Sequence, residues 1–310
     1  MQLRGQLKIV FNTRPVSEVL DDPHVSKDTK DKLSLVGRVK RFGVEELGLQ
    51  DTRNYESYFD QHGKPLMRVV TASEPYRLKA YSWRFPFLGR VSYKGFFETA
   101  RADKMSEQLA DEGFDVYAYP VGAWSTLGWL HDPVLSGMLD RDVGDLVELI
   151  LHESLHATVY LKGSTEFNEN LATVVGEEGS KAFLLKQFGA GSDELIRYQH
   201  QLHDDSLYVG HFIRGAAYLQ ELYASPYFKD AGQTKETLKQ AAIARIIADS
   251  DTLGFLDADW KARIHKRKWN NAHFLSYLRY QGEKDSLRTV INSRFKGDIK
   301  AFVAKLQSVD

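Results

Sequence analysis

Apolar residues recur at helical spacing between Ser26 and Leu49, and charged residues occupy the positions between them. Such a period predicts an amphipathic helix that buries one face against the rest of the protein. Gly37 and Gly43 lie inside the stretch, and each disfavours a helix by about 1 kcal/mol relative to alanine. The pattern therefore predicts one long helix with two weak positions. The apolar positions are Leu33, Leu35, Val36, Val39, Phe42, Val44 and Leu47.

The next part of the chain alternates short strand-like runs with turns. Three runs rich in β-branched and aromatic residues, broken by proline and glycine, predict strands at residues 66–70, 77–83 and 89–93. A helical pattern follows at residues 97–112 and ends before a glycine, which commonly terminates helices. Residues 114–119 alternate as a strand does. We therefore predict a small sheet accompanied by a helix.

Helical periodicity dominates the rest of the sequence. Asp142 can cap a helix that runs to about Leu161, and a second helix extends from about Phe167 to Phe188. Residues 192–309 are also mostly helical by period. We expect a mostly helical α+β fold, with a small sheet beside the helix that follows Asp142. The chain is expected to form one unit over residues 1–310, with an N-terminal helical part at 1–65, the sheet and two central helices at 66–190, and a C-terminal helical part at 191–310.

Composition narrows the possible classes of function. The 310 residues include 41 basic and 42 acidic side chains, so no excess of one sign favours nucleic acid or an anionic membrane. The absence of cysteine excludes disulfides and thiolate chemistry, and it leaves any metal to histidine, carboxylate and water. No apolar run is long enough for a signal core or a membrane span. We therefore expect a globular protein with no nucleic-acid partner and no membrane span.

A metal-binding pattern lies in the middle of the chain. Residues 152–156 are His-Glu-Ser-Leu-His, and on a helix this spacing places both imidazoles on one face, one turn apart. That arrangement suits a single zinc ion. Glu153 lies beside the histidines, where it can take a proton from metal-bound water. The motif predicts a hydrolytic zinc site with His152 and His156 as ligands and Glu153 as the general base.

Glu169 is the expected third ligand. Residues 162–166 form a short polar loop that would fold the second central helix back beside the first. His156 and Glu169 are separated from this loop by similar numbers of residues, so both lie about 5 to 8 Å from it along their helices. A stripe of small residues on the second helix would allow close packing of the two helices. This stripe consists of Ala172, Thr173 and Gly176.

Asn168-Glu169-Asn170-Leu171-Ala172 resembles the Asn-Glu-x-x-Ala motif of gluzincins, which are zinc peptidases whose third ligand is glutamate. Over most of residues 5–180, the sequence resembles a bacterial family of predicted zinc aminopeptidases. The resemblance implies a zincin-like fold, one Zn²⁺ ion, and a peptide or protein substrate. It also implies a cell-envelope or periplasmic location, with the signal or lipid anchor missing from this sequence; the alternative is the cytoplasm. The matching blocks are 83–86, 93–97, 115–117, 123–128, 132–133, 149–156, 167–172 and 175–179.

One position departs from that family. Trp124 stands where the family favours tyrosine in an Ala-Tyr-Ser-Thr-Leu-Gly segment, which puts any catalytic role of this position in doubt. Zincins commonly bind substrate as an added strand along an exposed sheet edge near the metal. Residues 124–128 are the candidate for that edge. Trp124, Ser125 and Thr126 are therefore the candidate substrate contacts.

The residue that stabilises the developing oxyanion has several candidates. Gluzincins usually supply a tyrosine or histidine from a later helix. Among the tyrosines and histidines of residues 198–223, we favour His211 and Tyr218. The segment Trp269-Asn270-Asn271-Ala272, together with Tyr280, resembles another block of the family and is an equally good source.

Other charged residues have two interpretations each. Glu177 and Glu178 lie about two turns beyond the third ligand, where one of them could orient a histidine ring. Glu148 lies one turn before the first histidine and has the same alternatives. The basic run at residues 261–268 suggests either an acidic partner or a solvated helix face, and we prefer the second.

The expected function is zinc-dependent hydrolysis of peptide bonds, in which Glu153 assists the attack of water. Removal of N-terminal residues is implied by the family resemblance alone, because no motif that would hold a free amine is identifiable. A zinc endopeptidase is the alternative. A non-catalytic, metal-stabilised binding or regulatory protein is a further alternative, although the intact Glu153 favours an enzyme.

Overall fold

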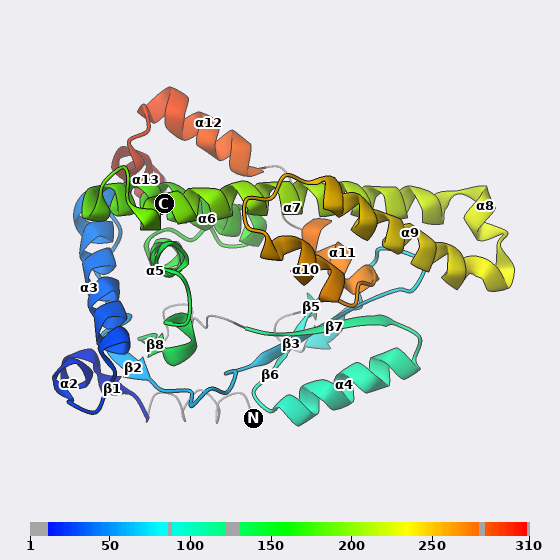
Figure 1. Ribbon diagram of the computed structural model, residues 1–310, viewed down its shortest axis with the longest axis horizontal. Helices are drawn as coiled ribbons and strands as arrows, with labels where there is room; N and C mark the ends of the chain where they lie inside the picture. The colour runs from blue at the N-terminus through cyan, green and yellow to red at the C-terminus, as the bar shows by residue number, and fades with distance from the viewer. Residues whose placement is uncertain (1–11, 86–88, 122–130, 279–282, 309–310) are drawn as a thin grey trace. The chain divides into compact units, whose positions relative to one another are not determined.

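The computed structural model describes residues 12–85, 89–121, 131–278 and 283–308, and it is mostly helical with short strands (Figure 1). The predicted α+β class is confirmed. Contacts between Cα atoms divide the chain into two compact units, each built from separate segments of the sequence. The single peptidase unit and the zincin-like arrangement stay predictions. The first unit combines Met1–Pro65, Gly122–Gln199 and Gly282–Asp310, and the second combines Leu66–Val121 and His200–Gln281.

The long N-terminal helix of the first unit is α3, Lys27–Leu47. The side chain of Ser26 accepts a hydrogen bond from the backbone N–H of Thr29, and Gly48 ends the helix in the left-handed region at φ 71°. The predicted helix is confirmed, and it runs unbroken through Gly37 and Gly43. A Cβ atom on Gly43 would lie 3.3 Å from Cδ2 of Leu151, so this glycine permits close packing between α3 and a central helix.

The two central helices are α5, Val143–Thr158, and α6, Thr165–Phe188. Both predicted helices are confirmed, although α5 ends three residues earlier than expected. Their apolar faces are fully buried, and Leu151 and Leu171 each have 0% of their surface exposed. A Cβ atom on Gly179 would lie 2.8 Å from Cδ1 of Leu47 and 3.0 Å from Cδ1 of Leu151, so α3, α5 and α6 meet at this glycine.

Short strands connect the segments around these helices. Strand β2, Ser57–Phe59, pairs antiparallel with β1, Arg14–Pro15, and parallel with β8, Val134–Leu135. This sheet joins three parts of the chain: the segment before α2, the segment after α3 and the segment before α5. Strands of two or three residues carry no detectable period, so the sequence did not predict them. The first unit also contains α2, Val16–Asp21; a 3₁₀ turn, Ser136–Met138; α12, Glu283–Phe295; and α13, Ile299–Gln307.

The second unit contains a three-stranded antiparallel sheet in the order β6-β3-β7. Strand β3, Arg68–Ser73, lies between β6, Lys94–Phe96, and β7, Asp115–Pro120. Helix α4, Thr99–Asp111, packs on this sheet and is followed by Gly113 at φ 85°. The predicted small sheet and its helix are confirmed.

One predicted strand is wrong. A turn at Pro75 and Tyr76 leads back to Ala80, which forms only an isolated bridge with Ser73, and β4, Trp83–Phe85, begins at the end of the predicted stretch and pairs with β5, Gly89–Val91. The hydroxyl of Ser73 donates to the backbone carbonyl oxygens of Arg77 and Lys79, at 3.2 and 3.3 Å, and so holds the turn closed. Turn formation therefore outweighs the local strand propensity of this stretch.

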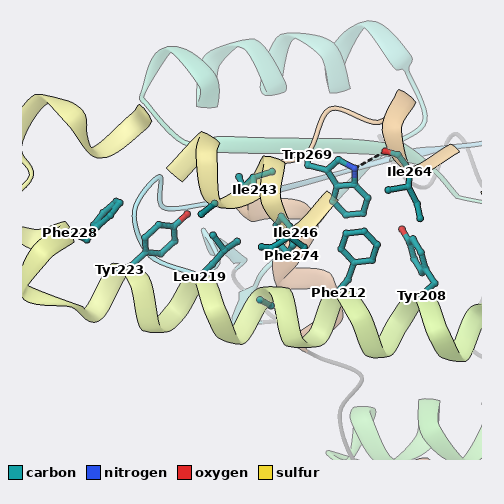
Figure 2. Packing of buried hydrophobic residues seen from close by; sticks show 12 residues of the cluster. Tyr208, Phe212, Leu219, Tyr223, Phe228, Ile243, Ile246, Ile264, Trp269 and Phe274 are labelled. Atoms are coloured by element: carbon teal, nitrogen blue, oxygen red, sulfur yellow. Dashed lines mark hydrogen bonds between the residues drawn. The ribbon is translucent and has the colours of Figure 1, made fainter. Parts of the chain in front are cut away.

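The helices of the second unit surround a core rich in aromatic residues (Figure 2). Phe212 and Trp269 stack with their ring centroids 4.1 Å apart, and the indole N–H of Trp269 donates to the carbonyl oxygen of Ile264 at 2.9 Å. No helix among the described residues is long and apolar enough to span a lipid bilayer. The helices are α7, Asp193–Ala224, whose first residues belong to the first unit; α8, Pro226–Lys229; α9, Lys235–Asp249; α10, Asp259–Lys266; α11, Asn271–Leu278; and the 3₁₀ turns Gly232–Thr234 and Ser250–Thr252.

Candidate metal and active site

His152 and His156 lie one turn apart on α5, as the sequence predicts. Their Nε2 atoms are 3.2 Å apart, and the two rings are nearly perpendicular, at 85°. Both side chains are largely buried, with 20% and 11% of their surface exposed. The two imidazoles therefore point their Nε2 atoms at the same small volume.

Glu169, on the first turns of α6, lies against both histidines. Its Oε2 atom is 3.5 Å from Nε2 of His152, and its Oε1 atom is 3.5 Å from Nε2 of His156. The three side chains offer one ligand atom each, and these atoms all lie within 4.8 Å of one another. The structure therefore brings together all three residues that the sequence named as metal ligands.

The side chain of Asn168 fixes the loop that joins the two central helices. Its Oδ1 atom accepts from the backbone N–H of Leu161 at 2.9 Å, and its Nδ2 atom donates to the carbonyl oxygen of Leu161 at 2.8 Å. This pair of bonds sets where α6 begins relative to α5, and it places the neighbouring Glu169. The sequence analysis identified Asn168 only as part of the family motif and did not predict this role.

Small residues on α6 allow the close approach that the ligands require. A Cβ atom on Gly176 would lie 3.3 Å from the backbone oxygen of Glu148 and 3.4 Å from Cβ of His152. Ala172 is fully buried, and the hydroxyl of Thr173 donates to the carbonyl oxygen of Glu169 at 2.8 Å. The predicted close packing along this stripe is confirmed.

The spacing of the three donor atoms fits a tetrahedral zinc ion. Two ligands bound at about 2.1 Å in tetrahedral geometry lie about 3.4 Å apart. The two Nε2 atoms are 3.2 Å apart and each lies 3.5 Å from a different oxygen of Glu169, which is close to this edge length, and one ligand atom from each residue lies within 4.8 Å of the other two. Two imidazoles and one carboxylate are also a usual donor set of a catalytic zinc site, and they leave the fourth position open.

The charges of the ligands are coupled. Hydrogen bonds from His152 and His156 hold the pKa of Glu169 well below its usual range, so this carboxylate is ionised at neutral pH. Burial opposes the charged form of His156, but the hydrogen bond and negative charge of Glu169 outweigh burial and raise the pKa of the imidazole. Protons therefore compete with a metal for this site as the pH falls.

Glu153 lies on α5 between the two histidines, in an environment that differs from that of Glu169. Burial raises the pKa of Glu153, the histidines oppose this rise, and the negative charges of Glu169 and Asp132 add to it. A carboxylate with a raised pKa has the higher proton affinity that a general base needs. The two glutamates of the site therefore have pKa values shifted in opposite directions.

Tyr55 and Asp132 also belong to the surroundings of Glu153, and the sequence did not predict either role. Tyr55 is buried, adopts a left-handed backbone at φ 65°, and donates its backbone N–H to the carbonyl oxygen of Asp132 at 2.7 Å. Burial, and then the charge of Glu153, raise the pKa of the Tyr55 phenol. The backbone N–H of Asp132 donates to Oδ1 of Asn54 at 3.0 Å, which fixes this pair of segments.

A second buried carboxylate lies one turn before the first histidine. The hydroxyl of Tyr198 donates to Oε2 of Glu148 at 2.8 Å, and burial raises the pKa of Glu148 to about 7. Gly144 makes room for the phenol ring, because a Cβ atom there would lie 2.5 Å from Cδ2 of Tyr198. Glu148 is therefore a buried proton-binding group on the same helix as the site.

The two other candidate partners of the histidines are paired elsewhere. Glu177 forms ion pairs with Lys284 and Arg288 of α12, and Glu178 pairs with Lys181 at 2.6 Å. Arg288 also approaches Glu178 at 3.5 Å. These contacts give both carboxylates a structural role between α6 and α12.

The roles of five further predicted site residues stay predictions. Trp124, Ser125 and Thr126 are outside the described residues. His211 and Tyr218 lie on the part of α7 that belongs to the second unit. The Nε2 atom of His211 donates to the carbonyl oxygen of Ile246 at 2.7 Å, and Tyr218 has 38% of its surface exposed. The oxyanion role of both residues stays a prediction.

A cleft of about 1100 Å³ opens in the first unit between α3 and residues 51–57. Tyr55 is one of its lining residues, so the same residue borders the cleft and contributes to the surroundings of Glu153. The cleft also carries charged groups of both signs, including Lys40, which approaches Glu56 at 3.8 Å.

Comparison with known proteins identifies the family of the chain. A model of the family described as "Putative aminopeptidase" matches residues 1–310, the full length of the sequence. No curated protein and no solved structure matches the chain. The resemblance to a family of predicted aminopeptidases is thereby confirmed, and the family description implies a peptidase. Because the match covers the whole sequence, the chain belongs to the putative aminopeptidase family.

Proposed function

We propose that this protein is a zinc-dependent aminopeptidase in which His152, His156 and Glu169 hold one Zn²⁺ ion and Glu153 is the general base. The observation that carries the proposal is the convergence of the three side chains: the two Nε2 atoms are 3.2 Å apart, each lies 3.5 Å from one oxygen of Glu169, and one ligand atom from each residue lies within 4.8 Å of the others. The open fourth position of such a set is the feature that separates catalytic from structural zinc sites.

The bound ion would supply a water molecule of lowered pKa and would polarise the scissile carbonyl group. Glu153 accepts a proton from the attacking water and delivers it to the leaving amine. Its burial favours this exchange, because a raised pKa brings the proton affinity of the carboxylate closer to that of the groups it serves. Glu169 stays ionised throughout, since hydrogen bonds from the histidines hold its pKa low.

The expected substrate is a peptide or protein. Action at a free N-terminus rests on the family description, because none of the contacts at the described site identifies groups that hold an α-amine. An endopeptidase uses the same metal centre and the same base. The intact Glu153, buried beside the ligands, favours either peptidase over a binding protein that keeps the metal for stability alone.

Digestion of a mixed peptide library by zinc-loaded protein tests the proposal, with products followed by mass spectrometry. We expect stepwise loss of N-terminal residues. Glu153→Gln should bind zinc normally and lower the rate of cleavage by about 10² to 10⁴-fold, which is the usual contribution of a general base. Internal cuts would assign an endopeptidase instead. Absence of cleavage by protein with a full complement of zinc would contradict both peptidase forms.

A further inference from the structure

A large aromatic side chain is exposed beside the candidate metal site. Tyr160 follows the C-terminal end of α5 and has 44% of its surface exposed. Its ring lies edge-on to the ring of His156, with the centroids 6.4 Å apart and the planes at 68°. Among the described residues, no hydrogen bond and no second ring contact holds this side chain. A face of the tyrosine ring is therefore open to solvent beside a candidate metal ligand.

The backbone on both sides of Tyr160 is fixed by hydrogen bonds. Val159 is buried, and its N–H donates to a carbonyl oxygen in the last turn of α5 at 2.8 Å. On the other side, the backbone N–H and the carbonyl oxygen of Leu161 both bond to the side chain of Asn168. The bonds that set the start of α6 therefore also set the position of Tyr160. A binding group on a fixed backbone loses little conformational entropy when a ligand arrives.

The candidate ligands are also accessible from solvent. The side chain of Glu169 is 43% exposed, and those of His152 and His156 are 20% and 11% exposed. His156 lies between two exposed side chains, because its Nε2 atom is 3.5 Å from Glu169 and its ring centroid is 6.4 Å from that of Tyr160. This second distance is less than two spacings of about 3.8 Å between consecutive Cα atoms. A peptide bond placed at the ligand atoms therefore has the side chain of a neighbouring residue within reach of the Tyr160 ring.

Other large apolar side chains exposed on the first unit lie far from the ligands along the chain. Leu185 and Phe188 are near the C-terminal end of α6, and both lie about 24 Å or more beyond Glu169 along the helix at 1.5 Å per residue. Single exposed apolar residues of this kind are common and need no function. Tyr160 differs from them because its backbone is fixed and its ring lies beside His156.

We propose that Tyr160 binds the side chain of a substrate residue next to the cleaved bond, and that it gives the protein a preference for peptides with a large apolar or aromatic residue there. This inference rests on the proposed peptidase function and names its class of substrate. The ring supplies the contact, because aromatic faces pack well against apolar side chains and other rings. The hydroxyl is not required: a donor to an oxyanion acts where water is excluded, whereas Tyr160 is exposed.

The first test compares the peptides of a mixed library that zinc-loaded protein and its variants cleave, with products followed by mass spectrometry. Tyr160→Ala should lower kcat/KM about tenfold or more for peptides with a large apolar residue beside the cleaved bond, relative to peptides with alanine or glycine there. The loss should appear in KM, because the contact is made equally before and during the reaction. Tyr160→Phe keeps the ring and should keep the preference. Phe188→Ala is the matched control, since it removes another exposed ring of the same unit, and it should also keep the preference.

Two further measurements do not depend on a loss of cleavage. Tyr160→Arg should shift the preference toward acidic side chains at the same position, because a guanidinium pairs with a carboxylate. Equilibrium dialysis of the library against zinc-loaded Glu153→Gln protein measures binding without turnover. Adding Tyr160→Ala to this protein should weaken binding of the peptides with large apolar residues by a similar factor of about ten, and leave zinc binding unchanged.

The outcomes separate this inference from the proposed function. Cleavage with a preference that Tyr160→Ala leaves unchanged would overturn the inference and leave the peptidase standing. Loss of activity toward all peptides in Tyr160→Phe would also overturn it, because the hydroxyl would then act in the reaction. If the zinc-loaded parent protein cleaves nothing, the peptidase function fails and the binding measurement decides. Equal binding by Glu153→Gln protein with and without Tyr160→Ala, or no binding by either, would then overturn the inference as well.

Discussion

Among individual residues, Glu148 and Glu169 show how position decides the state of a carboxylate. Both lie close to the histidines of α5, yet one has a raised and the other a lowered pKa. Glu169 receives hydrogen bonds from two imidazoles, whereas Glu148 is buried with a single hydrogen bond from the neutral hydroxyl of Tyr198. Burial without a compensating charge favours the protonated acid.

Glu148 should therefore make the stability of the metal-free protein depend on pH. Its folded pKa of about 7 exceeds the usual carboxyl value of 4.5, so the folded state binds this proton more tightly than the unfolded state. The stabilisation is fully present below pH 4.5 and is lost as the pH rises through 7. The shift corresponds to a ceiling of roughly 3 kcal/mol in the free energy of unfolding.

Glu148→Gln, which stays neutral and keeps an acceptor for Tyr198, should be more stable than the parent protein at pH 8 and similar to it at pH 5. Urea unfolding of chelator-treated protein at both pH values measures this difference. Glu166→Gln, an exposed residue at the start of α6, is the control and should change neither value. A Glu148→Gln variant that is less stable at pH 8 would contradict the assignment of a buried, costly charge.

The sequence predicted some residues of the candidate site and missed others. His152 and His156 are set by one helical turn, and Glu169 lies a short loop away, so local spacing was sufficient. Tyr55 and Asp132 come from segments held together by strands of two or three residues. Such pairing depends on tertiary contacts, which no local pattern encodes.

Among the elements, the packing of α5 against α6 positions the metal ligands. Gly176 lies at their contact, where a Cβ atom would meet the backbone oxygen of Glu148 at 3.3 Å. Gly37 lies within α3, where the nearest atom to a new Cβ would be the mobile Nη1 of Arg41, at 3.9 Å. The two glycines share helical conformation but differ in the space around them.

Alanine at these two glycines should have opposite effects. Gly37→Ala should stabilise the protein by up to about 1 kcal/mol, because alanine restricts the unfolded chain. Gly176→Ala should destabilise it by about 1 to 3 kcal/mol, because a backbone oxygen cannot move aside, and it should also weaken zinc binding. Chemical denaturation and a chelator competition assay measure both quantities. Stabilisation by both substitutions would show that α5 and α6 are less tightly packed than described.

The long helices were predictable because each repeats an apolar face over four turns or more, as α3 and α6 do. Residues 77–83 gave the wrong result, since Ser73 closes a turn there through its hydroxyl. The hydrogen bond between Asn270 and Val116 was also beyond prediction, because the two residues lie more than 150 positions apart in the chain. The first failure comes from local hydrogen bonds and the second from a contact between distant segments.

At the scale of the whole molecule, the proposed zinc ion should stabilise the first unit. A ligand that binds only the folded state at a hundred times its Kd contributes about 2.7 kcal/mol. Hydrogen exchange should therefore slow in α5 and α6 when zinc is added, more than in the β6-β3-β7 sheet of the second unit. Glu169→Gln is the control, because an amide has one acceptor oxygen in place of two, and it should show a weaker effect. Equal protection in both proteins would argue against Glu169 as a ligand.

The first unit contains segments from both ends of the given sequence. Helix α12 contacts α6 through Arg288 and Glu177, and it follows the whole second unit in the chain. During synthesis on a ribosome, the proposed metal ligands therefore emerge more than 100 residues before Arg288, which pairs with Glu177 of α6. The second unit can fold while α12 is still being made, so the first unit is completed after it. Such an order would delay the assembly of the proposed hydrolytic centre until α12 has been synthesised.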